Sequence, residues 1–142
     1  MTAVQDILLS IEHLDVFYPG HPPKQAVVDA SLVVARGACV GVVGGSGCGK
    51  TTIAKTIAGL ETPAAGRIVF DGEVIAEAGR PADRRHRRAI QLVFQDSLGA
   101  LNPRMRIGTA LAEVLRHHSR DEVATRAARD ARLRELVAQV EL

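Results

Sequence analysis

Residues 44–51 read Gly-Gly-Ser-Gly-Cys-Gly-Lys-Thr. A glycine followed by four residues, then Gly, Lys and Ser or Thr, is the pattern of a phosphate-binding P-loop. An apolar run at residues 39–43 precedes the loop, and apolar residues with helical spacing, Ile53, Ile57 and Leu60, follow it. A strand, a glycine-rich loop and a helix in this order predict a site for the phosphates of a nucleotide.

The residue types of the loop suit a polyphosphate. Successive backbone amides in a tight turn can point at one anion, and the N-terminus of the next helix adds its positive dipole end. We expect Lys50 to reach the β- and γ-phosphates, Thr51 to offer its hydroxyl to Mg²⁺, and Thr52 to lie beside the α-phosphate. The predicted nucleotide-binding residues here are Gly44, Gly45, Ser46, Gly47, Cys48, Gly49, Lys50, Thr51 and Thr52. The weaker interpretation is a glycine-rich turn with a solvated lysine.

Composition limits the other classes of function. The chain of 142 residues can bury one core. Two cysteines, Cys39 and Cys48, are too few for a disulfide framework and favour reduced thiols in a cytosol. Four arginines lie between residues 84 and 88, but three Phe and one Tyr are the only aromatic residues, so a nucleic-acid partner is not expected. The sequence shows no membrane span and no signal peptide, which predicts a soluble or peripheral protein.

Patterns along the chain predict a core followed by helices. Two β-rich stretches, Ile7–Tyr18 and residues 26–35, flank a loop rich in Pro and Gly. After the P-loop helix, a strand at residues 67–70 reaches an Asp-Gly turn that predicts a hairpin, and residues 90–94 read as a further strand.

Beyond the last of these strands, the pattern becomes helical. One helix begins near Ile107, and Ser119 with Glu122 forms a capping box for the next. We expect a nucleotide-binding α/β core with an antiparallel β subdomain over residues 1–105, and the start of a truncated helical subdomain over residues 106–142.

Several segments together resemble the ATP-binding subunit of ABC transporters, over the whole length of the chain. Residues 66–72, Gly-Arg-Ile-Val-Phe-Asp-Gly, are similar to the family's strand and turn after the P-loop helix. Residues 93–96, Val-Phe-Gln-Asp, are similar to its Q-loop. Residues 94–104, Phe-Gln-Asp-Ser-Leu-Gly-Ala-Leu-Asn-Pro-Arg, are similar to the branch that imports oligopeptides, dipeptides or nickel.

The resemblance implies a fold and a set of roles. The fold is an α/β P-loop NTPase core with an antiparallel β layer and the start of a helical subdomain, and it is expected to be incomplete. Lys50 and Gln95 are the implied catalytic residues, and Thr51 and Gln95 the implied Mg²⁺ contacts. Gln95 would sense the γ-phosphate at the end of a parallel strand beside the P-loop.

Tyr18 occupies the place where the family stacks an aromatic ring on adenine. Phe17 is a competing candidate for this role. Strand alternation sends Phe17 and Tyr18 to opposite faces, so we expect one in the core and the other toward the nucleotide, and favour Tyr18 as the latter.

The family's signature sequence, its magnesium Asp with a catalytic Glu, and its switch His are absent from these 142 residues. The chain therefore reads as the N-terminal half of a transport ATPase, expected to bind Mg²⁺ and ATP but to hydrolyse ATP poorly alone. The resemblance implies transmembrane permease subunits and, in the full-length form, a second ATP-binding subunit as partners. It also implies a cytoplasmic protein, peripheral on the inner face of the cell membrane.

Two other classes stay open at this point. One is a non-catalytic nucleotide-binding module, and the other is a P-loop small-molecule kinase in which the arginines at residues 84–88 would imitate a lid. Two further expectations concern the chain itself. Apolar faces left uncovered should make it marginally stable, and Cys48, beside a lysine and a helix start, could be either a reactive thiol or an inert loop residue.

Overall fold

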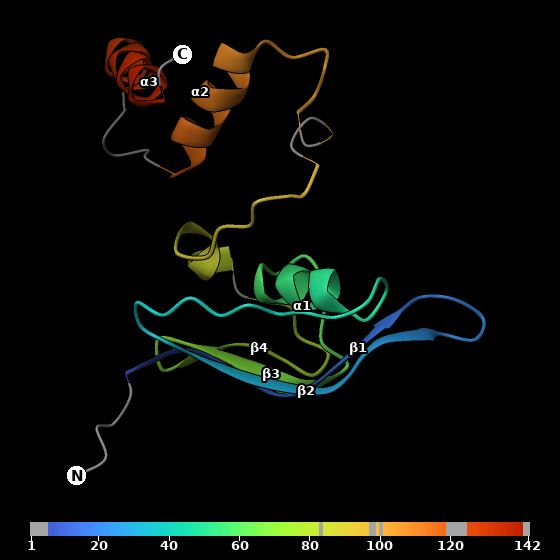
Figure 1. The fold of residues 1–142 in the computed structure, drawn as a ribbon. Coiled ribbons are helices and arrows are strands. Elements are labelled where there is room, and N and C mark those ends of the chain that lie inside the picture. Colours follow the sequence, from blue (N-terminus) through green and yellow to red (C-terminus); the bar gives the residue numbers. More distant parts are fainter. Residues whose placement is uncertain (1–5, 83, 97–98, 100, 119–124, 141–142) are drawn as a thin grey trace. The chain divides into compact units, whose positions relative to one another are not determined.

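The computed structural model describes residues 6–82, 84–96, 99, 101–118 and 125–140 (Figure 1). The chain divides into two compact units, Met1–Leu92 and Val93–Leu142. The two units are distinguished by the compact packing within each of them. The domain boundary expected after residue 105 rests on function instead and stays a prediction.

The first unit is built on a four-stranded antiparallel sheet with the order β2-β1-β3-β4. Its strands are β1 (Ile7–Tyr18), β2 (Lys24–Ala35), β3 (Ala65–Phe70) and β4 (Glu73–Glu77). The β1 strand pairs with β2 from Ile7 opposite Ala35 to Tyr18 opposite Lys24, and it pairs with β3 on its other side. The two β-rich stretches and the hairpin predicted from the sequence are therefore confirmed.

The turn between β3 and β4 has the conformation that its sequence requires. Asp71 has φ 50° and Gly72 has φ 79°, so both central residues lie in the left-handed region. Asp-Gly is among the few dipeptides that adopt this conformation at low cost, and the resulting turn matches the twist of an antiparallel pair. The pair Asp71-Gly72 therefore ends a hairpin strand, as expected.

The core of this unit lies on one face of the sheet. A register shift between Ile11 and Leu14 changes the alternation of β1, so that Ile11, Leu14 and Val16 are all buried. The helix α1 (Lys50–Ile57) lies over one face of the sheet (Figure 1). The buried apolar residues of the cluster are Ile11, Leu14, Val16, Val27, Ile68, Ile75, Ala76 and Ala82.

The packing of α1 differs from the apolar stripe expected from the sequence. Ile53 and Ile57 are only partly buried against the core, and Leu60 lies beyond the helix with 52% of its surface exposed. The buried positions of α1 are Thr52 and Thr56 instead. Thr56 can be buried because its Oγ1 donates to the carbonyl oxygen of Thr52 at 2.8 Å, which leaves no unsatisfied hydroxyl.

Residues 39–43 and 90–94, which the sequence predicted as strands, belong to no sheet in the described part of the chain. Val43 is 92% exposed and Val93 is 91% exposed. An apolar run becomes a strand only where a neighbouring strand takes up its backbone N–H and C=O groups. The expected position of Gln95 at the end of a parallel strand is therefore not observed.

The second unit contains two helices, α2 (Ile107–His118) and α3 (Arg126–Gln139), which contact each other. The hydroxyl of Thr125 caps α3 by accepting a hydrogen bond from the backbone N–H of Ala128 at 3.1 Å. The capping box expected at Ser119 and Glu122 lies outside the described residues. Among the described helices, none combines the length and the apolar character needed to cross a bilayer.

Candidate nucleotide-binding site

The predicted P-loop leads directly into α1, and residues 36–43 connect it to the end of β2. The helix begins at Lys50, and its N-cap residue Gly49 has φ 96°. The carbonyl oxygen of Gly49 accepts the first helical hydrogen bond, from the N–H of Ile53 at 2.9 Å. Gly47 also has a positive φ, of 80°. The loop therefore uses left-handed residues to turn into the helix N-terminus, where backbone N–H groups and the helix dipole favour an anion.

The side chain of Lys50 lies within the curve of the loop. Its Nζ donates to the carbonyl oxygens of Gly44 at 2.8 Å and Gly45 at 2.6 Å, and lies 3.4 Å from the Sγ of Cys48. These contacts bring the two ends of the loop together around one ammonium group. The arrangement places a positive charge beside the helix N-terminus, which is the charge that a polyphosphate needs.

A pocket of about 210 Å³ opens beside the loop. Three segments that are far apart in the sequence form it: the end of β1, the start of β2, and the loop with the first turn of α1. The lining residues are Tyr18, Lys24, Ala26, Gly47, Cys48, Gly49, Lys50, Thr51 and Thr52. The hydroxyl oxygen of Tyr18 lies 3.2 Å from Oγ1 of Thr52, within hydrogen-bond distance.

The shape of this pocket fits a nucleotide held mainly by its phosphates. A Cβ atom built on Gly45 or Gly47 would have no other atom within 4 Å, so open space surrounds the loop backbone there. Pockets that enclose a whole small molecule usually measure about 300–1,000 Å³. A pocket of 210 Å³ is smaller than this range and has room for a polyphosphate.

The structure brings most of the predicted site residues together. Tyr18 and the P-loop residues Gly47 to Thr52 line one pocket, and Gly44 and Gly45 contact Lys50. Ser46 is exposed in the loop and is not a lining residue. Gln95 belongs to the second unit, whose position relative to the first is not determined, so its pairing with the P-loop stays a prediction.

The expectation for the two adjacent aromatic residues is partly wrong. Tyr18 is half-buried and lines the pocket, but Phe17 is 43% exposed and does not belong to the core. The sequence analysis also missed Lys24 and Ala26 as lining residues. The hairpin could have indicated Lys24, because an antiparallel strand after a short loop places it directly opposite Tyr18.

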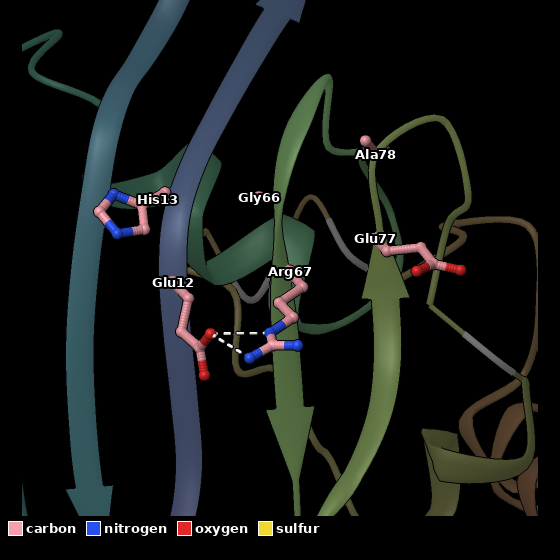
Figure 2. Close-up of a pocket in the computed structure, with 6 residues that line it drawn as sticks. All are labelled: Glu12, His13, Gly66, Arg67, Glu77 and Ala78. Atoms are coloured by element: carbon pink, nitrogen blue, oxygen red, sulfur yellow. Dashed lines mark hydrogen bonds and ion pairs between the residues drawn. The ribbon is translucent and has the colours of Figure 1, made fainter.

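A second hollow, of about 340 Å³, lies on the sheet and has a different character (Figure 2). Its polar side chains already have partners: Nη2 of Arg67 lies 2.7 Å from Oε2 of Glu12, Nδ1 of His13 lies 2.7 Å from Oδ1 of Asp29, and Oε1 of Glu77 lies 3.4 Å from Nη1 of Arg80. The hydrogen bond from Arg67 lowers the pKa of the Glu12 carboxyl below its usual value. The described residues contain no group of three His, Cys, Asp or Glu side chains that could hold a metal ion.

Comparison with known proteins decides the family. The sequence profile described as ABC transporter matches residues 27–142. The chain belongs to the ABC transporter family. This family member therefore carries the P-loop and the segment around Gln95 within one matched region, which confirms the resemblance inferred from those motifs.

The sequence relatives are named as ATP-binding proteins of importers. The nickel import ATP-binding protein NikE of Rhodospirillum rubrum is 44% identical over 116 residues, covering 81% of this chain and 42% of its own length. NikE of Escherichia coli K12 is 42% identical over 78% of this chain and 43% of its own length. A Brucella ovis protein named for peptide import is 41% identical over 95% of this chain and 42% of its own length. The chain thus spans less than half the length of these curated relatives.

The fold agrees with a solved ATP-binding cassette. MJ0796, in a dimeric post-hydrolysis structure bound to ADP and Pi, matches 95% of this chain and 58% of its own length. The TM-score is 0.73 and the sequence identity is 22%. At this identity the likeness concerns the fold alone. It confirms the expected P-loop NTPase fold, of which this ABC transporter family member contains part.

Proposed function

We propose that this chain is the ATP-binding component of an ABC-type importer of the peptide or nickel class, and that it binds Mg²⁺ and ATP to energise uptake. The observation that carries the proposal is the pocket in which Tyr18 faces the P-loop residues Lys50 and Thr52. An aromatic ring, an ammonium and a helix N-terminus in one pocket supply contacts for a base and for a polyphosphate. The names of the sequence relatives support the importer class.

Each side chain of the pocket has a proposed part in holding the nucleotide. Lys50 neutralises charge on the β- and γ-phosphates, and Thr52 donates to the α-phosphate. The ring of Tyr18 stacks on adenine. Thr51, exposed in the first turn of α1, offers its hydroxyl to Mg²⁺. When bound, Mg²⁺ supplies neutralisation of the phosphate charge.

Hydrolysis is proposed to be slow in this chain by itself. Phosphoryl transfer depends on the positioning of the attacking water and on stabilisation of charge in the transition state. The 142 residues contain the phosphate-binding loop and Gln95, but neither the signature sequence nor the Asp-Glu pair that the family uses. Gln95 is the proposed contact to Mg²⁺ and to the γ-phosphate.

The proposed partners are the transmembrane permease subunits of such an importer and, in the full-length protein, a second ATP-binding subunit. The proposed location is the cytoplasmic face of the cell membrane. Co-purification of the tagged chain with the permease subunits of a nickel or dipeptide importer tests this part of the proposal. Recovery of the chain without either permease, from membranes that contain both, would contradict it.

The nucleotide-binding part is tested by measuring Mg-ATP binding and ATP turnover on the same sample. We expect saturable binding by isothermal titration calorimetry, together with phosphate release far slower than the kcat of about 1–10³ s⁻¹ typical of enzymes. Absence of binding would overturn the proposal. Turnover within that range would overturn the claim that this chain hydrolyses ATP slowly by itself.

A further inference from the structure

The contact between Tyr18 and Thr52 joins two parts of the pocket that are expected to meet different parts of a ligand. Tyr18 is the last residue of β1, and Thr52 lies in the first turn of α1. Their hydroxyl oxygens are 3.2 Å apart, and either oxygen could be the donor. Thr52 is buried, with 6% of its surface exposed, whereas Tyr18 is half-buried. A polar side chain as buried as Thr52 needs its hydrogen bonds to be made within the site.

The chemistry of the two hydroxyls decides which one donates when a phosphate is present. Each hydroxyl carries one proton and can accept hydrogen bonds on its oxygen. A phosphate oxygen has no proton to give at this position, so it must accept the hydrogen bond that the Thr52 hydroxyl donates. Tyr18 is then left as the donor to Thr52, and the result is a chain from Tyr18 through Thr52 to the phosphate. Hydrogen bonds in such a chain strengthen one another.

Without that donor, Thr52 has a competing use for its proton. A threonine hydroxyl within a helix tends to bond to a carbonyl oxygen three or four residues earlier, and its χ1 angle changes accordingly. The backbone of Thr52 is already fixed, since it lies in the first turn of α1. The remaining freedom is the rotation of the Thr52 side chain, and Tyr18 contacts the hydroxyl that this rotation moves.

We propose that the hydroxyl of Tyr18 is a positioning group that holds Thr52 with its proton directed at the phosphate nearest the nucleoside. This inference rests on the proposed function, because it assigns a role within the same nucleotide site. The ring of Tyr18 and its hydroxyl then act on different parts of the ligand. The ring contacts the base, and the hydroxyl acts on the phosphates through Thr52.

The first test compares Tyr18→Phe with the wild-type chain, using calorimetry with Mg-ATP and with Mg-tripolyphosphate, which has no base. Tyr18→Phe keeps the aromatic ring and removes the hydroxyl. We expect it to weaken both ligands by about 2- to 10-fold, the range for one neutral hydrogen bond. Tyr18→Ala should weaken Mg-ATP further, because stacking is also lost, and should affect Mg-tripolyphosphate no more than Tyr18→Phe does.

The second test is a double-mutant cycle with a matched control in the same helix. Thr52→Val removes the hydroxyl that Tyr18 contacts, and Thr56→Val removes a buried hydroxyl one turn later that Tyr18 does not contact. Tyr18→Phe should add no loss of affinity in the Thr52→Val background and should add its full loss in the Thr56→Val background. A purely structural role for the Tyr18 hydroxyl would not depend on Thr52 in this way.

The outcomes separate this inference from the proposed function. If neither ligand binds the wild-type chain, both are overturned. If both ligands bind and Tyr18→Phe leaves their affinities unchanged or increases them, the inference is overturned and the nucleotide site stands. Losses that are additive between Tyr18→Phe and Thr52→Val would also overturn it.

Discussion

A Cβ atom at Gly49 would lie 2.5 Å from the carbonyl oxygen of Ala26, and 3.2 Å from the Cγ2 atom of Val27. The N-cap of α1 thus sits directly against the backbone of β2. This contact fixes the P-loop against the sheet at the position where the loop turns into the helix. It is also the reason why Gly49, the fourth glycine of the loop, cannot be replaced by a larger residue without a backbone shift.

We therefore expect Gly49→Ala to destabilise the chain. The new side chain would meet the Ala26 carbonyl and would have to adopt a φ of 96°, which residues with a Cβ rarely take. The expected loss in the free energy of unfolding is about 1–3 kcal/mol. Gly41→Ala is the matched control, because a Cβ there would meet no atom within 4 Å. Equal urea midpoints for the two variants would contradict this account.

The pairing of Glu12 with Arg67 predicts a pH dependence. The hydrogen bond from Arg67 lowers the pKa of Glu12 below its usual value of 4.5. Because the folded pKa is the lower one, the stabilisation by ionised Glu12 is fully present above the unfolded pKa and is lost as pH falls through the folded pKa. Both side chains are substantially exposed, so the effect on stability is small.

A carboxyl carbon NMR titration of Glu12 checks this prediction. Arg67→Met should raise the pKa of Glu12 toward its usual value. Arg36→Met is the control, since Arg36 hydrogen-bonds to Asp6 and Asp71 instead. A Glu12 pKa that does not move in Arg67→Met would show that another group sets it.

Labelling of the two cysteines with a maleimide should distinguish the P-loop from the segment before it. Both Cys39 and Cys48 are exposed, but only Cys48 lines the nucleotide pocket. We expect Mg-ATP to slow the labelling of Cys48 at least severalfold, as measured by peptide mass spectrometry. The labelling rate of Cys39, which serves as the internal control, should not change. Equal slowing at both positions would indicate a general change in the fold, and no slowing would argue against the site.

Much of the first unit could be predicted from local sequence because its signals are local. The Asp71-Gly72 pair specifies a turn, and alternation around it specifies two antiparallel strands. The P-loop pattern specifies a loop that leads into a helix at Lys50. In each of these cases, the residues whose pattern predicts the turn or loop are also the residues that form it.

The predictions that were wrong concern features that depend on contacts with residues distant in the sequence, which no local pattern reveals. Residues 39–43 read as a strand, but the described chain supplies no neighbour for them, and Val43 is exposed. The burial of Thr52 and Thr56 in place of an apolar stripe depends on how α1 meets the sheet and on a side-chain hydrogen bond. The proximity of Tyr18 to the loop was inferred from the family resemblance and could not have come from spacing alone.

The most direct test of the central claim compares Mg-ATP affinity in Lys50→Met and Lys55→Met by equilibrium dialysis. Both lysines lie in α1, but Nζ of Lys50 lies within the loop, whereas Lys55 is in the last turn and does not line the pocket. We predict that Lys50→Met loses at least about 10-fold in affinity, as expected for loss of a charge-assisted contact, while Lys55→Met binds as the wild type does. Equal affinities of the two variants would contradict a phosphate site at this loop.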